Sequence, residues 1–185
     1  MLKGKKVLLR PVRRSDIQYF LKWFNDHDVI QYLSFYLPMT EMAEEKWIED
    51  LGTNRTKAAF VVEAIEGESG KPFDFAQGKP IGSIGLDNIS LKDHNATFGI
   101  AIGDKDYWSK GFGTEAARLI INYGFEQLNL HRINSSVIGF NERSYRLHKR
   151  LGFTEEGRQR EAIFKNGKFY DHVVLGILKE EWKGL

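Results

Sequence analysis

The stretch best suited to hold a ligand is a glycine-containing loop at residues 108–115, which reads Trp-Ser-Lys-Gly-Phe-Gly-Thr-Glu. It lies between a predicted strand and a long predicted helix. Glycines let a backbone turn sharply and approach a ligand closely, and the first N–H groups of a helix have no partner within it. With the positive end of the helix dipole, these groups predict a phosphate or pyrophosphate site, although simple tight turns show the same pattern.

Two nucleotide-binding motifs are similar to this loop but fit it poorly. The loop lacks the Gly-Lys-Ser/Thr ending of a P-loop. Residues 111–116 match the dinucleotide pattern Gly-x-Gly-x-x-Ala, but seven residues separate the preceding strand from Gly111, where a dinucleotide-binding turn is tight. The strand predicted at 133–138 is followed by Gly-Phe-Asn rather than by an acidic residue. An NAD-dependent oxidoreductase is therefore only a distant alternative.

A second group of polar residues lies along one stripe of a helix predicted from residue 141. Successive positions of the stripe are about one helical turn apart: Asn141, then Ser144 and Tyr145, then His148. Apolar Leu147 and Leu151 occupy the neighbouring positions, so the stripe follows the edge of the buried face, where a ligand cleft could lie. The plainer interpretation is that Asn141 only caps the helix and that His148 is a half-buried imidazole with satisfied hydrogen bonds.

The two groups together resemble the GNAT superfamily of N-acetyltransferases, through the glycine loop, the long helix after it, a strand, and Asn-x-x-Ser-x-x-Leu-His-x-x-x-Gly-Phe at 141–153. Residues 129–133 and 164–171 are similar to the branch of ribosomal-protein N-terminal acetyltransferases and bacterial spermidine acetyltransferases. The resemblance is specific from Thr97 to Ile177. It implies an acetyl-CoA-dependent enzyme that acetylates a protein N-terminus, a polyamine or a small amine. A non-catalytic coenzyme-A-binding regulatory module is the alternative.

The resemblance also implies where acetyl-CoA binds. The family's coenzyme loop falls on Trp108, Ser109, Lys110, Gly111, Phe112, Gly113 and Thr114, whose backbone N–H groups would hold the pyrophosphate. The splayed central strand of the family falls on Ala101, Ile102 and Gly103, where the pantetheine arm pairs as if it were a strand. Asn141 would bond this arm, with Ser144 beside it. Trp108 stands where the family has Gln or Arg.

Two catalytic tasks follow from the same resemblance. An N–H group of Ile102 or Gly103 would stabilise the oxyanion that forms at the thioester carbonyl. His148 takes the position of the family's frequent tyrosine acid. Its imidazolium could protonate the departing thiolate, and Tyr145 could do so instead. The thiolate could also leave without an acid, because thiols of this kind have a pKa of about 8.5.

The attacking amine needs a base, because a free alkylamine is mostly protonated at pH 7. Asp87, His94 and Asp104 are the candidates, and the sequence does not rank them. The chain contains no cysteine, which excludes an acyl-cysteine intermediate. Direct transfer in a ternary complex is therefore expected, and alignment of amine and carbonyl would supply as much as ~7–11 kcal/mol of the catalysis.

The acceptor amine is expected to bind near residues 26–45. This stretch combines acidic and aromatic residues that suit a cation: Asp26, Asp28, Glu41, Glu44, Glu45, Tyr32, Phe35 and Tyr36. An equally good interpretation is that these carboxylates are solvated charges at helix starts.

Composition limits the remaining classes of function. With 27 basic and 25 acidic residues the net charge is only +2, which argues against a nucleic-acid binder. No apolar run has membrane-spanning length, and the N-terminus lacks a signal peptide's apolar stretch, so a cytoplasmic protein is expected. The absence of cysteine excludes thiolate zinc sites, and the short acidic triplets indicate solvated loops, so no metal is expected. A homodimer is plausible by analogy with relatives.

The elements that must position these residues form a single α/β (α+β) domain over 1–185. The resemblance to the GNAT superfamily implies its core: a mixed, mostly antiparallel sheet, splayed at the coenzyme site and flanked by about four helices. Strands are predicted at 7–10, 60–65, 81–86, 97–102, 133–138, 160–165 and 170–177, the last two joined by an Asn166-Gly167 turn. Helices are predicted after Ser15 and Thr40, from Gly113 to about Leu128, and from Asn141 to Leu151. Residues 70–79 read as a loop insertion without function, although Phe73 and Phe75 could instead cover a partner or a substrate.

Overall fold

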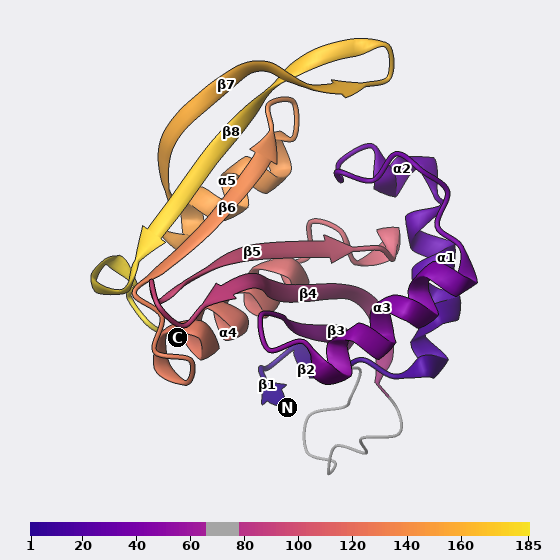
Figure 1. Ribbon diagram of the computed structural model, residues 1–185, viewed down its shortest axis with the longest axis horizontal. Helices are drawn as coiled ribbons and strands as arrows, with labels where there is room; N and C mark the ends of the chain where they lie inside the picture. The colour runs from indigo at the N-terminus through magenta and orange to yellow at the C-terminus, as the bar shows by residue number, and fades with distance from the viewer. Residues whose placement is uncertain (66–77) are drawn as a thin grey trace.

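The described part of the chain, residues 1–65 and 78–185 of a computed structural model, builds one eight-stranded sheet (Figure 1). The strands are β1 Leu2–Lys3, β2 Val7–Pro11, β3 Ala58–Ala64, β4 Lys79–Ser90, β5 Asn95–Ile102, β6 Arg132–Ile138, β7 Thr154–Lys165 and β8 Lys168–Leu178. They lie in the order β1-β2-β3-β4-β5-β6-β8-β7, and the β5–β6 pair alone is parallel. This confirms the expected mixed, mostly antiparallel sheet. The expected insertion lies outside the described residues except for positions 78 and 79.

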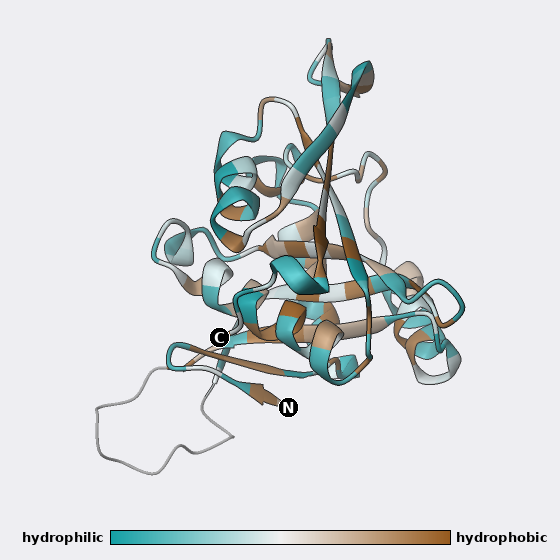
Figure 2. Ribbon diagram, turned by 90° about the vertical axis from the view of Figure 1, so that its left-hand side faces the viewer, coloured by the Kyte–Doolittle hydropathy of each residue, from teal (hydrophilic) through white to brown (hydrophobic). Residues whose placement is uncertain are grey.

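Helices cover both faces of the sheet. They are α1 Ile17–Phe24, α2 His27–Ile30, α3 Glu41–Thr53, α4 Phe112–Glu126 and α5 Glu142–Leu151. Successive residues of a strand point to opposite faces, and β3 shows the result: Val61 packs with Phe20 of α1, whereas Val62 belongs to the larger core that contains the buried side of α4. In Figure 2 the apolar stretches accordingly lie where strands and helices meet.

The sheet splits in its middle, between β5 and β6. These strands pair only through Asn95↔Arg132, Ala96↔Ile133 and Thr97↔Asn134. Beyond the third pair β5 remains bonded to β4, and β6 remains bonded to β8, so the two strands diverge (Figure 1). The divergence leaves one edge of each strand without a neighbouring strand, which is the splay that the sequence predicts.

Three of the expected helix ends are confirmed, and one is wrong. Thr40 accepts a hydrogen bond from Ala43 N, Asn141 accepts one from Ser144 N, and Gly152 ends α5 with a left-handed φ of 95°. Ser15 does not cap α1, which begins at Ile17 after a 3-10 turn over Arg14–Asp16. Asp16 precedes α1 without a side-chain cap bond to it; its carboxylate, buried against Arg10, instead accepts the N–H of Arg13 at 2.7 Å and so closes the 3-10 turn.

The terminal hairpin is longer than expected. Its first strand begins at Thr154, not at residue 160. The sequence pattern did not mark the earlier start, because the mostly polar and charged residues 155–162 are largely exposed and show no apolar alternation. The Asn166-Gly167 turn is confirmed, with φ values of 50° and 79°. The hairpin tip reaches the region of α2, a helix that the sequence did not predict. There Lys165 Nζ donates to Ile30 O (3.3 Å) and Phe35 O (2.5 Å).

Candidate active site

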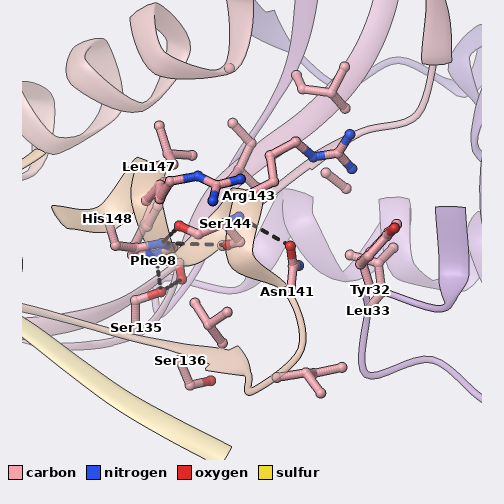
Figure 3. Close-up of a pocket in the computed structure, with 18 of the residues that line it drawn as sticks. Tyr32, Leu33, Phe98, Ser135, Ser136, Asn141, Arg143, Ser144, Leu147 and His148 are labelled. Carbon is pink, nitrogen blue, oxygen red and sulfur yellow. Dashed lines mark hydrogen bonds between the residues drawn. The ribbon is translucent and has the colours of Figure 1, made fainter. Parts of the chain in front are cut away.

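A cavity of about 550 Å³ lies in the split of the sheet (Figure 3). Its walls come from the facing edges of β5 and β6, from α5, from the glycine loop before α4, from residues 29–34 and from the terminal hairpin. Elements that are far apart in the sequence therefore meet here. The diverging strands leave a gap, and the helix, loops and hairpin that surround it form its walls.

The residues that line the cavity come from both faces of the sheet. Ser135 points toward His148 of α5, whereas Ser136 points the other way (Figure 3). Ile138 shares the face of Ser136, and its partner on β8 is His172. We call the side under α4 and α5 the helix face. We call the opposite side the hairpin face; it is lined by Val29, Leu33, Ser34, Ser136, Ile163 and His172.

The backbone of β5 offers free groups to the split at alternate residues. Gly103 N donates to Ile81 O at 2.9 Å, so its N–H is used in bonding to β4. Alternation in an antiparallel pair then directs the backbone groups of Ile100 and Ile102 toward the gap. Trp108 Nε1 reaches Ile102 O at 2.6 Å from that side. Ile102 is thus placed as expected, Gly103 is not, and Ile100 is an additional donor that the sequence did not indicate.

Gly103 has a different role, which is to let a tryptophan approach β5. A Cβ atom built at Gly103 would lie only 2.1 Å from Cγ of Trp23. The indole of Trp23 belongs to the smaller core, with Phe20 and Phe24 of the same helix. The glycine is therefore required by packing at the end of β5 rather than by contact with a ligand.

The glycine loop has the geometry of an anion site. Gly111 caps α4 with a φ of 90°, a conformation that favours glycine, and Ser109 also has a positive φ of 59°. Lys6 Nζ donates to Lys110 O at 3.2 Å, and the carboxylate of Glu115 accepts the N–H of Lys6 at 3.1 Å. The loop is therefore anchored to the N-terminal segment, while the first turn of α4 starts beside the end of β5.

Trp108 closes the loop against α5. The guanidinium of Arg143 lies 3.9 Å from the centroid of the Trp108 indole and 5.2 Å from that of the Tyr32 ring. The two rings themselves meet edge to face at 6.2 Å. A tryptophan in place of the family's Gln or Arg thus keeps the loop in position through its indole N–H and through this cation–π stack.

Among the remaining predicted residues of α5, Asn141 and Ser144 line the cavity and Tyr145 does not. Asn141 Oδ1 accepts the N–H of Ser144 at 3.1 Å, which leaves the amide NH₂ of Asn141 available for a ligand. The hydroxyl of Tyr145 donates to Glu155 at 2.8 Å, outside the cavity lining, and this bond raises the pKa of Tyr145. The structure does not bring Tyr145 to the site.

His148 lines the cavity but is 98% buried, with a relative exposure of 2%. Its Nδ1 lies 2.8 Å from the backbone oxygen of Ser144, and its Nε2 lies 2.8 Å from Ser135 Oγ. Burial lowers the pKa of His148 below the ordinary histidine value. Burial thus disfavours the imidazolium form, the form in which His148 could protonate a thiolate, and Nδ1 donates to the backbone oxygen of Ser144.

The helix face carries positive charge at its mouth. Arg143, Arg146 and Arg150 of α5 all line the cavity. Arg146 also lies 3.8 Å from the exposed Glu142 carboxylate, a pair that solvent screens. Together with the N–H groups at the start of α4, these guanidinium groups suit a ligand that carries several phosphates.

The acidic residues expected to bind the acceptor do not line the cavity. Asp26 and Asp28 both pair with Lys105, at 2.9 and 2.8 Å, and the bond to Lys105 lowers the pKa of Asp26. Glu44 is buried, which raises the pKa of its carboxyl. Neither Glu41 nor Glu45 belongs to the lining, and of the three aromatic residues only Tyr32 does. This stretch therefore contributes Val29, Tyr32, Leu33 and Ser34 to the lining but none of its carboxylates.

The three candidate bases also lie outside the cavity lining. Asp87 pairs with Thr97, five register positions from the Gly82↔Ile102 pair beside the glycine loop. His94 Nδ1 bonds Asn129 O at 3.1 Å, in the turn after β4. Asp104 caps the 3-10 turn Lys105–Tyr107 and pairs with Lys79 at 2.9 Å.

One titratable residue that the sequence did not indicate does line the hairpin face. His172 of β8 is half-buried, and its Nδ1 lies 3.2 Å from Gln159 Oε1 of β7. No sequence motif marks it, because its position depends on the pairing of β8 with β6. Within the described residues, no group of three or more His, Asp or Glu side chains could hold a metal ion.

Comparisons with known proteins agree with this geometry. A family model described as an acetyltransferase (GNAT) domain matches residues 6–154. The chain is 37% identical over 117 residues to the "Putative ribosomal N-acetyltransferase YdaF" of Bacillus subtilis, covering 63% of this chain and 62% of that protein. It is 29% identical over 186 residues to the spermidine N(1)-acetyltransferase of Escherichia coli K12, covering 98% and 91%.

A solved structure extends the similarity to three dimensions. Spermidine N-acetyltransferase from Vibrio cholerae, in complex with CoA and spermine, superposes with a TM-score of 0.84 at 26% identity, covering 96% of this chain and 98% of that one. The chain therefore belongs to the GNAT acetyltransferase family. It is an acetyl-CoA-dependent N-acetyltransferase, and the alternatives of a non-catalytic module and of an NAD enzyme fall away. No described helix is long and apolar enough to cross a membrane.

Proposed function

We propose that this N-acetyltransferase acetylates the N-terminal amine of a peptide or protein, which enters on the hairpin face while acetyl-CoA binds on the helix face. The observation that supports a peptide is the neutral lining of the hairpin face. Its polar groups are Ser34, Ser136 and His172, set among the apolar side chains of Val29 and Leu33. Hydroxyl groups and apolar walls suit the backbone and small side chains of a peptide end.

Acetyl-CoA is assigned to the helix face through the residues already described. The N–H groups of residues 110–114 would hold the pyrophosphate, because they combine free donors with the helix dipole. Arg146 and Arg150 would meet the 3′-phosphate, and the amide of Asn141 would bond the pantetheine arm. The N–H groups of Ile100 and Ile102 point into the gap, where they would polarise the thioester carbonyl.

In this arrangement His148 is a positioning residue rather than the acid. Its ring holds Ser135 Oγ at the point where β5 and β6 separate, beside Phe98 O at 3.1 Å. The thiolate then leaves without a proton from His148. A thiolate with a conjugate-acid pKa of about 8.5 is a good enough leaving group for this.

The contrast with a polyamine rests on charge. Each additional ammonium group of spermidine or spermine needs a carboxylate or a comparable anionic partner when it is desolvated. Among the described residues that line the cavity there is no Asp or Glu, and three are Arg. A polyamine remains the second candidate, because the Vibrio cholerae neighbour that superposes so well was solved with spermine.

The experiment is CoA release, followed with a thiol reagent, in a panel of amines. Because the chain has no cysteine, the protein contributes no thiol background. The panel contains short peptides with free N-termini, and the same peptides with a blocked N-terminus and a single lysine side chain. It also contains spermidine and spermine. We expect kcat/KM for the best free N-terminus to exceed that for either polyamine by at least about tenfold, which corresponds to roughly 1.4 kcal/mol. A preference for spermidine of that size would contradict the peptide assignment.

A further inference from the structure

We propose that His172 is the general base that deprotonates the acceptor amine. The proposal rests on the N-acetyltransferase activity of the family and on the assignment of the amine to the hairpin face. It does not depend on which amine is the natural acceptor, because every alkylammonium must lose a proton before it can attack.

The placement of His172 comes from strand register. His172 pairs with Ile138, the last residue of β6, whose side chain shares the face of Ser136. The imidazole therefore lines the hairpin face of the same cavity that Ile100 and Ile102 line. An amine placed between them would have the thioester carbonyl on one side and the imidazole on the other.

The other titratable and charged groups near this face are poorly suited to act as the base. Tyr32 carries a phenol, a weak base at neutral pH, and lies beneath the Arg143 guanidinium. Tyr170 is two residues earlier on β8, with its ring packed on Phe140 at 4.6 Å. Lys165, at the hairpin tip, donates to backbone oxygens. The opposing residue on β7 is the neutral Gln159.

The hydrogen bond to Gln159 fixes which nitrogen can act. Gln159 Oε1 is an acceptor and lies 3.2 Å from Nδ1, so Nδ1 carries the proton. The lone pair is then on Nε2, the nitrogen that is not bonded to β7. Gln159 is thus a positioning residue that sets the tautomer, as a hydrogen-bonded partner does for other catalytic histidines.

The chemistry balances without any further reactant. His172 Nε2 takes one proton from the substrate ammonium, directly or through one water, and the nitrogen regains its electron pair. That pair forms the new N–C bond at the thioester carbon, the C–S bond breaks, and its electrons leave on the CoA thiolate. The nitrogen loses a second proton as the amide forms, and the thiolate takes up one proton from solvent. His172 returns its own proton to solvent.

The test compares His172→Gln with His94→Gln, a matched histidine replacement outside the cavity. Both variants are assayed with the best amine of the wild-type panel and with an alkoxyamine, which is already neutral at pH 7. General-base catalysis contributes about 10²–10⁴-fold. We expect kcat of His172→Gln with the alkylamine to fall by about this factor, with little change in the acetyl-CoA dissociation constant, and the alkoxyamine rate to fall far less. His94→Gln should retain wild-type kcat.

Three outcomes would overturn the assignment. The first is a kcat of His172→Gln within about threefold of wild type. The second is an equal loss with the alkylamine and the alkoxyamine, which a purely structural role would give. The third is an unchanged acidic limb in the pH–rate profile of the variant, because that limb should report protonation of the base. A wrong acceptor assignment would appear instead in the wild-type panel, before any variant is measured.

Discussion

At the scale of single residues, two histidines of the same cavity have different uses because their surroundings differ. His148 is enclosed between α5 and β6, and both of its ring nitrogens have protein partners. His172 is half-buried on the hairpin face, with one nitrogen held by Gln159. Burial lowers the pKa of His148, whereas the ring of His172 lines the hairpin face of the cavity. We therefore propose a positioning role for the histidine that matches the family motif, and we propose the other histidine as the base.

Gly103 gives a residue-scale prediction about stability. In Gly103→Ala the new methyl would overlap the Trp23 indole, so the strand end or the indole must shift. Overpacking of this kind costs about 1–3 kcal/mol. Urea denaturation should show a midpoint that is lower by the corresponding amount, with an unchanged slope.

Gly99→Ala is the matched control for this substitution. Gly99 lies on β5, four residues before Gly103, and a Cβ built there has no atom within 4 Å. Its unfolding free energy should stay within about 0.5 kcal/mol of wild type. Equal effects of the two substitutions would show that the Trp23 contact does not explain Gly103.

At the scale of elements, a buried ion network joins β2, the turn before α1, and β3. Arg10 contacts Asp16 at 2.7 Å and also bonds Glu63, and the side chains of all three are at most 6% exposed. The network holds the start of α1 against the sheet, and α1 in turn carries Trp23 to the end of β5. The end of β5 is therefore supported by the ion network of Arg10, Asp16 and Glu63, none of which lines the cavity.

Arg10→Met should destabilise the protein strongly, because it leaves two buried carboxylates without their cation. The expected loss of unfolding free energy is about 3–5 kcal/mol. Arg14→Met is the control: Arg14 pairs with Glu49 at 2.9 Å, but both side chains are more than 60% exposed, and such surface pairs contribute about 0–1 kcal/mol. Chemical denaturation of both variants checks this, and a loss below about 1 kcal/mol for Arg10→Met would contradict it.

At the scale of the whole molecule, the proposed assignment gives the two substrates separate entrances to the split sheet. The loop before α4 and the arginines of α5 are on the helix face, whereas residues 29–34 and the hairpin line the opposite face. In the proposed arrangement the amine would reach the thioester while the coenzyme stays bound. The hairpin tip completes this arrangement by bonding the backbone of the segment after α2.

Initial-velocity kinetics should therefore show a ternary complex. With acetyl-CoA and the amine both varied, double-reciprocal plots should intersect, because acetyl transfer requires both substrates at once. The absence of cysteine removes the thiol that most readily stores an acyl group. Parallel lines, or a stoichiometric burst of CoA in the absence of amine, would indicate an acyl-enzyme and contradict direct transfer.

Much of the fold and of the coenzyme site was predictable from the sequence, because the relevant signals are local. Glycines at 111 and 113, caps at Thr40, Asn141 and Gly152, and the Asn166-Gly167 turn each act on the backbone within a few residues. Hydrophobic periodicity located the main strands and helices for the same reason. These features determined the anion loop, the helix that follows it and the family to which the chain belongs.

Only the tertiary structure decided the acceptor side. Asp26 and Asp28 form ion pairs with Lys105, and Glu44 is buried. The spacing of these residues in the sequence reveals neither fact. Gly103 bonds to β4 while Ile100 faces the gap, because strand register assigns each backbone group to one edge. His172 reaches the cavity only because β8 inserts between β6 and β7. Local sequence fixes backbone conformation, whereas long-range strand pairing decides which side chains share a cavity.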